Sequence, residues 1–385
     1  MKKPLLIVVI ILAVILILPV INFIRWTFQT KKPMDIVLVD KTVPTLDREK
    51  HKSFDWILTN ERYVKKEKRA SYSYRNDYYG FSPKRPLRDR LFEKNDYHVA
   101  DLINIAENSD AVYFTDTYGV YFSDWYRSLN KPRRTRKFYG GLNNVDNLLI
   151  KEMKDRNKLV LLEYNTFDYP TVEYEAVKLQ ERLGIRYSGW TGQYYSTLDT
   201  TRDVDFPSWM TAMYRKQYKK PWNFTKPGVV FLQEKSIVVL EEGTHLKTSL
   251  PLIKTDSASC TRFNLVPSVV FDHSFDVIDP LENNVISKFV LETTSLGDSL
   301  LADNNLKKEF PAVIQDPVVQ RTYYFSGDFT NKNIPYWTSR FKGIEKLKWF
   351  LYSEKPDDTR RFFWLYYRPL IVGILDNYYK SLSAK

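Results

Sequence analysis

The feature that most constrains the fold is an alternation of short apolar runs and amphipathic segments between residues 34 and 190. Met34–Asp40 (MDIVLVD), Asp110–Asp116 (DAVYFTD) and Lys158–Leu162 (KLVLL) have the length and composition of buried strands. Asn144–Arg156, which precedes the last of these runs, has the apolar spacing of a helix. Strands that alternate with helices predict an α/β fold whose sheet is mostly parallel and is flanked by helices.

The second half of the chain is richer in strand patterns than in helix patterns. Extra antiparallel strands are therefore expected beside the parallel sheet. The expected strands, the second of them a hairpin, are Ile185–Trp190, Gly228–Leu240, Val266–Ile278, Asn284–Thr293, Phe310–Gln315 and Arg321–Phe329. The apolar spacing of Ser339–Tyr352 predicts a helix. By contrast, Glu61–Arg90 contains one glycine and two prolines between basic residues and is expected to be irregular.

The N-terminal run Pro4–Ile24 carries no charge and is dominated by Ile, Leu and Val. About 20 apolar residues are needed to cross the hydrocarbon core of a bilayer. A cleaved signal peptide is the alternative, but the bulky residues of Ile21–Thr27 do not provide its small-residue cleavage site. We therefore expect a single transmembrane helix within residues 1–30, with Trp26 and Phe28 at the membrane interface.

Charged residues flank both ends of this run, with Lys2 and Lys3 before it and Arg25, Lys31 and Lys32 after it. A short N-terminal tail with two lysines is typical of a bacterial signal anchor. The expected location is therefore the bacterial cytoplasmic (inner) membrane, with the main domain on the extracytoplasmic side. The lipid bilayer is the first expected partner.

The composition excludes several classes of function. The formal net charge is +12, which permits an anionic partner such as membrane lipid. No zinc-finger spacing, RNA-binding aromatic motif or helix-turn-helix accompanies this charge, so nucleic acid is not an expected partner. The one cysteine, Cys260, and the four scattered histidines show no metal-ligand spacing. Phosphate-binding and dinucleotide-binding loops are also missing, so no metal and no cofactor are expected.

Three parts are expected along the chain. Residues 1–30 form the anchor, residues 31–345 form the α/β domain with its strand-rich additions, and residues 346–385 form an aromatic, apolar helical tail. Arg361–Tyr379 (RFFWLYYRPLIVGILDNYY) is too polar and too interrupted to span a bilayer. This segment either lies in the membrane interface beside the anchor or docks on the core.

Three carboxylates are expected at the ends of strands: Asp116, Glu163 and Asp328. The carboxyl ends of parallel strands meet at one edge of a sheet, where ligands bind, so these side chains are expected to converge. As catalytic residues they could act as general acid and base in the hydrolysis of a glycosidic bond. The alternative for each residue is structural, because a carboxylate at a strand end also caps a helix or pairs with a cation.

Aromatic and amide side chains near the same edge are candidates for ligand binding. Aromatic residues make up 15% of the chain, and an aromatic ring can stack on the apolar face of a sugar. The candidates are Tyr118, Tyr164, Asn165, Phe167 and Trp190, the last of them in the expected loop Ser188–Tyr195 (SGWTGQYY).

One stretch resembles the class I glutamine amidotransferase-like superfamily. The strand DAVYFTD, the pair Gly140 and Gly141, the helix NNVDNLLIKEMKDR and the strand KLVLLEYN follow one another in the order typical of that family. The resemblance covers residues 34–190 and implies a flavodoxin-like three-layer fold. It also implies that the turn after KLVLL holds the nucleophile, within a G-x-C-x-G motif.

The sequence departs from the family at this turn. The turn reads Leu162, Glu163, Tyr164, Asn165 and Thr166, with no cysteine and neither flanking glycine. The His-x-Glu pair of the family is also missing, since neither His245 nor His273 is followed by a glutamate two residues later. Glutaminase chemistry requires a thiolate activated by histidine, so a degenerate member without this activity is expected.

Three functions follow from these observations. The first is a membrane-anchored extracytoplasmic binding module that recognises a cell-envelope glycan or a partner protein. The second is a carboxylate-dependent hydrolase that acts on a carbohydrate through Asp116, Glu163 and Asp328. The third is a structural subunit of an envelope complex, in which the C-terminal tail packs against a membrane-protein partner. A flat apolar patch of Phe362, Trp364, Tyr366 and Leu370 would favour the third function.

Overall fold

The computed structural model describes residues 17, 19–126, 135–202 and 206–383. Most of the expected membrane anchor, residues 1–16 and 18, lies outside the described residues. Among those described, no helix is both long enough and apolar enough to cross a membrane. Residues 19–27, at the end of the expected anchor, are helical.

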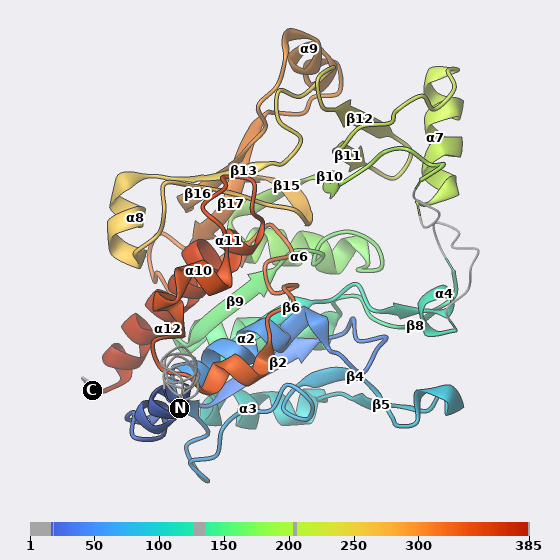
Figure 1. Ribbon diagram of the computed structural model, residues 1–385. Helices are drawn as coiled ribbons and strands as arrows, with labels where there is room; N and C mark the ends of the chain where they lie inside the picture. The colour runs from blue at the N-terminus through green and yellow to red at the C-terminus, as the bar shows by residue number, and fades with distance from the viewer. Residues whose placement is uncertain (1–16, 18, 127–134, 203–205, 384–385) are drawn as a thin grey trace, which may run out of the picture.

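A mixed β-sheet forms the centre of the molecule (Figure 1). Ten strands of the described chain belong to it, in the spatial order β14 (Ser268–Val270), β13 (Leu252–Thr255), β16 (Asn284–Val290), β17 (Glu309–Gln315), β18 (Thr322–Phe325), β9 (Leu159–Glu163), β6 (Ala111–Asp116), β2 (Ile36–Asp40), β4 (Tyr79–Pro83) and β5 (Phe92–Asn95). The strands from β18 to β4 are parallel, and antiparallel strands flank them on both sides. The expected α/β class with added antiparallel strands is therefore confirmed.

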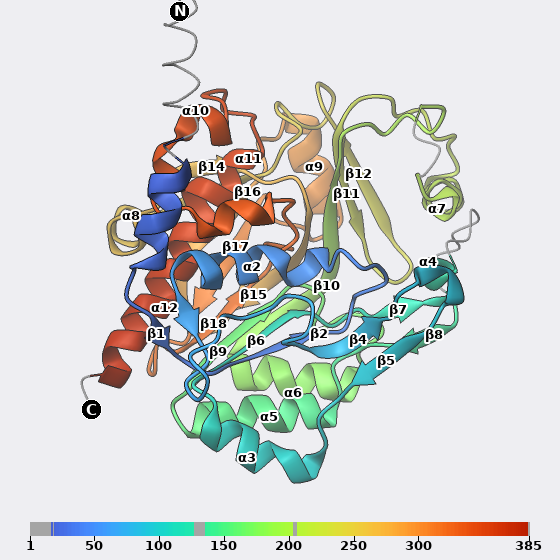
Figure 2. The ribbon, with the colours of Figure 1, turned by 60° about the horizontal axis from the view of Figure 1, so that its bottom comes forward.

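Helices cover both faces of this sheet and make three layers (Figure 2). The helices on one face are α3 (Leu102–Asn108), α5 (Asn144–Asp155) and α6 (Glu173–Leu183), and those on the other include α2 (Glu49–Asn60) and α12 (Arg368–Ser383). The other labelled α-helices of the described chain are α4 (Phe122–Trp125), α7 (Ser208–Tyr218), α8 (Ser257–Phe263), α9 (Ser295–Asp303), α10 (Lys348–Leu351) and α11 (Arg360–Phe362). A separate hydrophobic cluster fills each interface between a helix layer and the sheet.

The central strands form where the apolar runs predicted them. Every residue of β2 and of β9 is buried, since both faces of a parallel sheet are covered by helices. Local signals also bound the helices. The Asn143 side chain accepts hydrogen bonds from the backbone at the start of α5, and Gly184, with φ 65°, ends α6 in the left-handed conformation.

A second, antiparallel sheet stands beside the first, in the order β12 (Ile237–Glu241), β11 (Gly228–Leu232), β10 (Ile185–Tyr195) and β15 (Ser274–Pro280). It contains the expected hairpin. The expected loop Ser188–Tyr195 is instead part of β10, whose pairing with β15 shifts between Tyr187 and Thr191. Both glycines of this segment are needed by the strand. Gly189 has φ 82° and lies where the pairing with β15 shifts, and a Cβ on Gly192 would lie 2.2 Å from the Phe275 ring.

Two other expectations are wrong. Ser339–Tyr352 is not one helix but η3 (Tyr336–Arg340), η4 (Ile344–Lys346) and α10, because Gly343 with φ 83° interrupts the spacing. Glu61–Arg90 is not wholly irregular, because β4 lies within it. Gly80 has φ 141° and brings β4 so close to β2 that a Cβ would lie 1.7 Å from the Asp40 carbonyl oxygen. Short pairs join β1 (Lys32–Pro33) to β3 (Tyr63–Val64) and β7 (Val120–Tyr121) to β8 (Lys137–Tyr139).

The aromatic tail packs into the body of the protein as α11, a π-helix η5 (Phe363–Tyr367) and α12. An exposed patch of four side chains would have favoured the third function, but they are between 0% and 7% exposed and belong to the large cluster on one face of the sheet: Phe362, Trp364, Tyr366 and Leu370. They fill the core and do not form an exposed patch.

Candidate functional site

Carboxylates end the central strands at one edge of the sheet. Asp40 ends β2, Asp116 ends β6, and Glu163 ends β9. Asp328 follows β18 by three residues. Since these strands are parallel, the four side chains lie at the carboxyl edge. The order of strands predicted three of them, Asp116, Glu163 and Asp328, and missed Asp40.

Lys50 joins two of these carboxylates. It is the second residue of α2, which begins at this edge because it follows β2. Its Nζ lies 2.5 Å from Asp328 Oδ2 and 3.3 Å from Asp116 Oδ2. Asp116 Oδ1 also accepts hydrogen bonds from the Thr42 hydroxyl at 2.7 Å and from the Tyr118 backbone N–H at 2.8 Å. Asp116 therefore holds the loops that follow β2 and β6.

Glu163 connects β9 to the segment that follows β18. Its Oε1 accepts a hydrogen bond from the Thr330 backbone N–H at 2.7 Å. Its Oε2 accepts from the Thr330 hydroxyl at 3.0 Å and from the Tyr113 hydroxyl at 2.9 Å. Both carboxyl oxygens are therefore engaged with neighbouring protein groups.

The three expected catalytic carboxyl groups have different pKa values. Burial, and then the charge of Asp328, raises the pKa of Glu163 well above its usual value. Burial raises the pKa of Asp116 to about 6, although Lys50 opposes the shift. Burial alone would also raise the pKa of Asp328, but the charges of Lys50 and His273 and the hydrogen bonds from Lys50 and Asn331 bring it below its ordinary value.

These carboxylates converge, yet solvent hardly reaches them. Asp116, Glu163 and Asp328 are 2%, 1% and 4% exposed. A groove lies next to this cluster and is described below. None of the three carboxylates is among the described residues that line it. Their observed contacts fit the structural alternative, since each carboxylate holds a loop or pairs with a cation.

An aromatic groove of about 250 Å³ lies beside this cluster, between the loops after β6 and β9 and the second sheet. Four of its lining residues are aromatic and four others are polar. The lining comprises Tyr118, Tyr164, Asn165, Asp168, Tyr169, Thr191, Gln193, Trp209, Met210 and Leu232. We refer to it as the aromatic groove.

Three of the five expected binding residues line the aromatic groove: Tyr118, Tyr164 and Asn165. Asn165 has φ 72°, a left-handed conformation that asparagine tolerates. The other two are in the core. Phe167 is 4% exposed and packs on Tyr324, and Trp190 is 5% exposed.

Several groove residues were missed because they come from distant segments. Trp209 belongs to α7, and Thr191 and Gln193 belong to β10. No local pattern reveals that these elements face the loop after β9. Lys50 was also missed, although one signal could have found it: a helix that follows a parallel strand begins at the carboxyl edge.

Thr191 also connects the groove to a buried acid. Its hydroxyl donates to Asp276 Oδ1 at 3.3 Å, and Asp276 Oδ2 accepts from the Tyr324 hydroxyl at 2.6 Å and the Asn165 N–H at 3.2 Å. Burial raises the pKa of Asp276 to about 7, although the hydrogen bonds from Tyr324 and Asn165 oppose the shift. Asp276 thereby positions the backbone at the floor of the groove.

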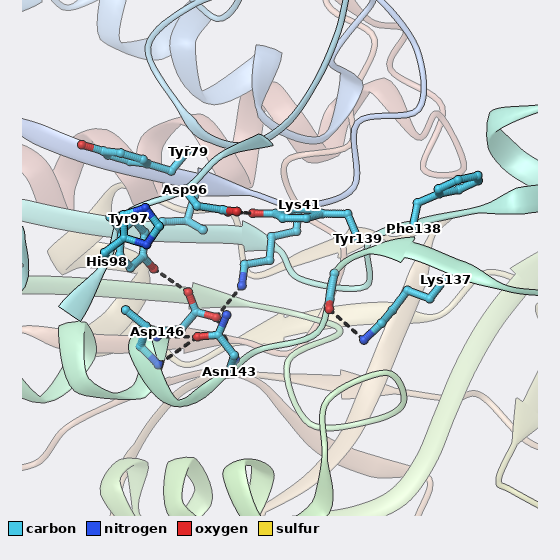
Figure 3. Close-up of a pocket in the computed structure, with 13 residues that line it drawn as sticks. Lys41, Tyr79, Asp96, Tyr97, His98, Lys137, Phe138, Tyr139, Asn143 and Asp146 are labelled. Carbon is cyan, nitrogen blue, oxygen red and sulfur yellow. Dashed lines mark hydrogen bonds and ion pairs between the residues drawn. The ribbon is translucent and has the colours of Figure 1, made fainter. Parts of the chain in front are cut away.

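A second cavity of about 360 Å³ opens at the same edge between the end of β2, β8 and the start of α5 (Figure 3). Two of its carboxyl groups accept hydrogen bonds from neighbouring groups, and the Lys137 ammonium donates to the Gly140 carbonyl at 3.0 Å. Asp146 accepts hydrogen bonds from Lys41 at 2.5 Å, from the Tyr97 hydroxyl at 2.5 Å and from the Asn143 N–H at 2.8 Å. Tyr139 donates to Asp96. These pairs hold the loops around α5 together.

Among the residues that the structure describes, no group of three or more His, Cys, Asp or Glu side chains is arranged to hold a metal ion. The carboxylate cluster instead has an internal cation, because the Lys50 ammonium lies between Asp116 and Asp328.

No protein-family model and no curated protein matches the sequence. Two solved structures are similar in shape. A β-galactosidase from Bacillus circulans sp. alkalophilus is 10% identical with a TM-score of 0.31, over 84% of this chain and 32% of that chain. A ThuA-like protein from Bacteroides uniformis is 9% identical with a TM-score of 0.34, over 86% of this chain and 97% of that chain. This chain thus spans about a third of the length of the β-galactosidase. With TM-scores this low, neither similarity supports an argument about function.

Proposed function

We propose that this protein is a membrane-anchored binding module that recognises a carbohydrate in the aromatic groove. The observation that carries the proposal is the combination of aromatic and polar residues in its walls. Tyr118, Tyr164, Tyr169 and Trp209 contribute aromatic rings to the lining, and such rings can stack on the apolar side of a sugar. Asn165, Asp168 and Gln193 carry side-chain oxygen or nitrogen atoms that can bond hydroxyl groups.

The charge of the groove supports a neutral ligand. Asp168 is the one charged residue among its described lining residues, and it is acidic. A phosphate or carboxylate group would therefore meet no cation there. The volume of about 250 Å³ lies just below the roughly 300–1,000 Å³ typical of small-molecule sites, so only a small ligand fits. A short neutral glycan fits both properties.

The proposed location follows from the N-terminal sequence. The uncharged run Pro4–Ile24 serves as a transmembrane anchor, and the binding domain lies on the extracytoplasmic side of a bacterial inner membrane. A cell-envelope glycan is then the accessible ligand class. The family proposal is a degenerate amidotransferase-like domain, in which Glu163 and Asn165 stand in the turn that holds the nucleophile cysteine in that superfamily.

The test is a screen of envelope glycans against the full-length protein in nanodiscs, followed by calorimetry on each glycan that binds. Trp209→Ala removes a groove ring and is expected to weaken binding by about tenfold or more. Trp337→Ala, which removes a tryptophan that is 61% exposed on η3, is the matched control and should leave binding unchanged. Equal affinities of the two variants would remove the groove from the proposal.

A second candidate function is the hydrolysis of a glycan. In its favour, the pKa of Glu163 is raised and the pKa of Asp328 is lowered. Glycoside hydrolysis requires such a pair, in which one carboxyl group stays protonated as the acid and the other stays ionised. In addition, Asp328 Oδ1 is buried without a hydrogen-bond partner among the described residues. Glu163→Gln should then abolish turnover of a glycan that the screen identifies. Unchanged turnover removes Glu163 from the reaction.

A further inference from the structure

An exposed apolar surface lies at one end of the molecule, where the N-terminal helix meets the segment before α11. On the helix, Ile17, Val20, Ile21 and Ile24 are between 44% and 56% exposed. The backbone N–H of Lys342 donates to the Asn22 carbonyl at 3.2 Å, which fixes the neighbouring segment against this helix. Figure 2 shows α10 at the same end of the molecule as the helix of residues 19–27.

The α10 segment presents its largest aromatic side chains to solvent. Trp349 is 82% exposed and Phe350 is 49% exposed, whereas Leu351 next to them is buried. Exposure of two large aromatic side chains at adjacent positions is costly in water unless another surface covers them. We call the surface formed by residues 17, 19–24 and 342–350 the helix-base surface.

The charge of the helix-base surface is positive. Lys346 and Lys348 are exposed beside Trp349. Glu345, the one acidic residue of the 342–350 segment, lies 3.7 Å from Arg368 in an ion pair. Tryptophan next to lysine is typical of the boundary between lipid headgroups and hydrocarbon, where the ring is partly buried and the ammonium group reaches the phosphates.

We propose that the helix-base surface lies on a bilayer that contains anionic lipid, with Trp349 and Phe350 in the headgroup–hydrocarbon boundary and Lys346 and Lys348 at lipid phosphates. The inference rests on the proposed membrane attachment. The bilayer is the occupant that the sequence favours, because the uncharged run from Pro4 leads directly into Ile17 on this surface. The contact would hold the domain in one orientation, with the lysine ammonium groups attracted to the anionic lipid surface.

The experiment measures the membrane depth of a nitroxide label on the full-length protein in nanodiscs. Trp349→Cys carries the label in a Cys260→Ser background, because Cys260 is a free, partly exposed thiol. Val318→Cys is the matched control, since Val318 is 86% exposed in the turn between β17 and β18. The label at residue 349 should collide more with oxygen than with a water-soluble nickel reagent, and the label at residue 318 should do the opposite.

The role of the two lysines is tested with the double variant Lys346→Glu and Lys348→Glu. The role of anionic lipid is tested by comparing two lipid compositions. In nanodiscs of phosphatidylcholine and phosphatidylglycerol, the double substitution should shift the label at residue 349 toward water. In nanodiscs of phosphatidylcholine alone, the protein with both lysines should hold the label at residue 349 less deeply than it does in the mixture with phosphatidylglycerol. Equal depth in both lipids would overturn the role of anionic lipid.

The outcomes separate this inference from the membrane anchor. A protein that enters nanodiscs but leaves the label at residue 349 as accessible to nickel as that at residue 318 overturns the helix-base contact and retains the anchor. A protein that does not enter nanodiscs overturns both. Phe350→Cys provides a second label position on the same surface, and circular dichroism verifies that each variant is folded.

Discussion

The ammonium group of Lys50 lies 2.5 Å from a carboxylate oxygen of Asp328, although 278 residues separate the two in the sequence. Lys50 comes from the first turn of α2, and Asp328 comes from the loop after β18. Partial burial would lower the pKa of Lys50, but the charges of Asp328 and Asp116 raise it above its ordinary value, so the lysine stays protonated. This ion pair ties the two ends of the α/β domain together at the carboxyl edge.

Lys50→Met should destabilise the protein by about 3–5 kcal/mol, because it leaves two buried carboxylates without their cation. Urea unfolding followed by circular dichroism measures the change. Lys307→Met is the matched control, since Lys307 pairs with Asp279 at 2.5 Å on the exposed surface and should cost less than about 1 kcal/mol. Equal costs for the two substitutions would show that the buried pair contributes no more than a surface pair.

The stability should fall as the pH rises through the pKa of Asp276. Its folded pKa of about 7 lies above the value of about 4 for an unfolded aspartate, so between these values the folded state binds more protons than the unfolded state. The stabilising contribution is therefore complete below about pH 4 and is lost as the pH rises to 7.

Asp276→Asn removes this titration. The difference in unfolding free energy between wild type and Asp276→Asn should change by up to about 1.4 kcal/mol per pH unit within that window. Urea unfolding at a series of pH values provides the measurement. Asp279→Asn, at the exposed end of β15, is the control and should keep the pH dependence of the wild type. Parallel curves for wild type and Asp276→Asn would contradict the assignment.

Gly140→Ala should destabilise the protein by more than about 3 kcal/mol, because it combines backbone strain with overpacking. Gly140 has φ 122°, and a Cβ there would lie 2.3 Å from the Cα of Gly119. Gly343→Ala is the matched control, since Gly343 has φ 83° but its Cβ would meet a flexible lysine side chain at 4.0 Å. It should cost about 1 kcal/mol. Thermal unfolding of both variants compares the two, and a smaller loss at Gly140 would mean that the loop before α5 can move.

Leu370→Ala should destabilise the protein by about 2–5 kcal/mol, because Leu370 is fully buried in the large hydrophobic cluster. Leu296→Ala in α9 is the control, since Leu296 is 56% exposed and should change the unfolding free energy by less than about 0.5 kcal/mol. Chemical denaturation in nanodiscs and in detergent gives both values. If Leu370→Ala were as mild as the control, the C-terminal tail would be peripheral to the core.

The strands at the centre of the sheet were predictable because their signal is local. The runs at Met34–Asp40, Asp110–Asp116 and Lys158–Leu162 became β2, β6 and β9, since strands covered on both faces are apolar throughout. By contrast, β4 was missed because Gly80 and Pro83 are read as breakers. Gly80 is needed because the backbone of β4 approaches Asp40 of β2 closely. No pattern around Gly80 reveals this approach, because Asp40 lies 40 residues earlier in the chain.

The candidate site divides in the same way. The convergence of Asp116, Glu163 and Asp328 followed from the order of parallel strands, but their burial did not. Glu163 is enclosed because Thr330, 167 residues later, folds over it and donates two hydrogen bonds. Lys50 comes from α2, and its two partners come from the ends of two other segments, β6 and the loop after β18.

By itself, the sequence determined the α/β class, the apolar run at the N-terminus and the edge of the sheet where polar side chains gather. All three depend on periodicity and composition within short windows. Only the tertiary structure decided which of those side chains face solvent. It enclosed Glu163, placed Phe167 and Trp190 in the core, and opened the aromatic groove between Tyr164 and Trp209. The physical reason is that the solvation of a side chain is set by segments from elsewhere in the chain that pack over it, and no local pattern records them.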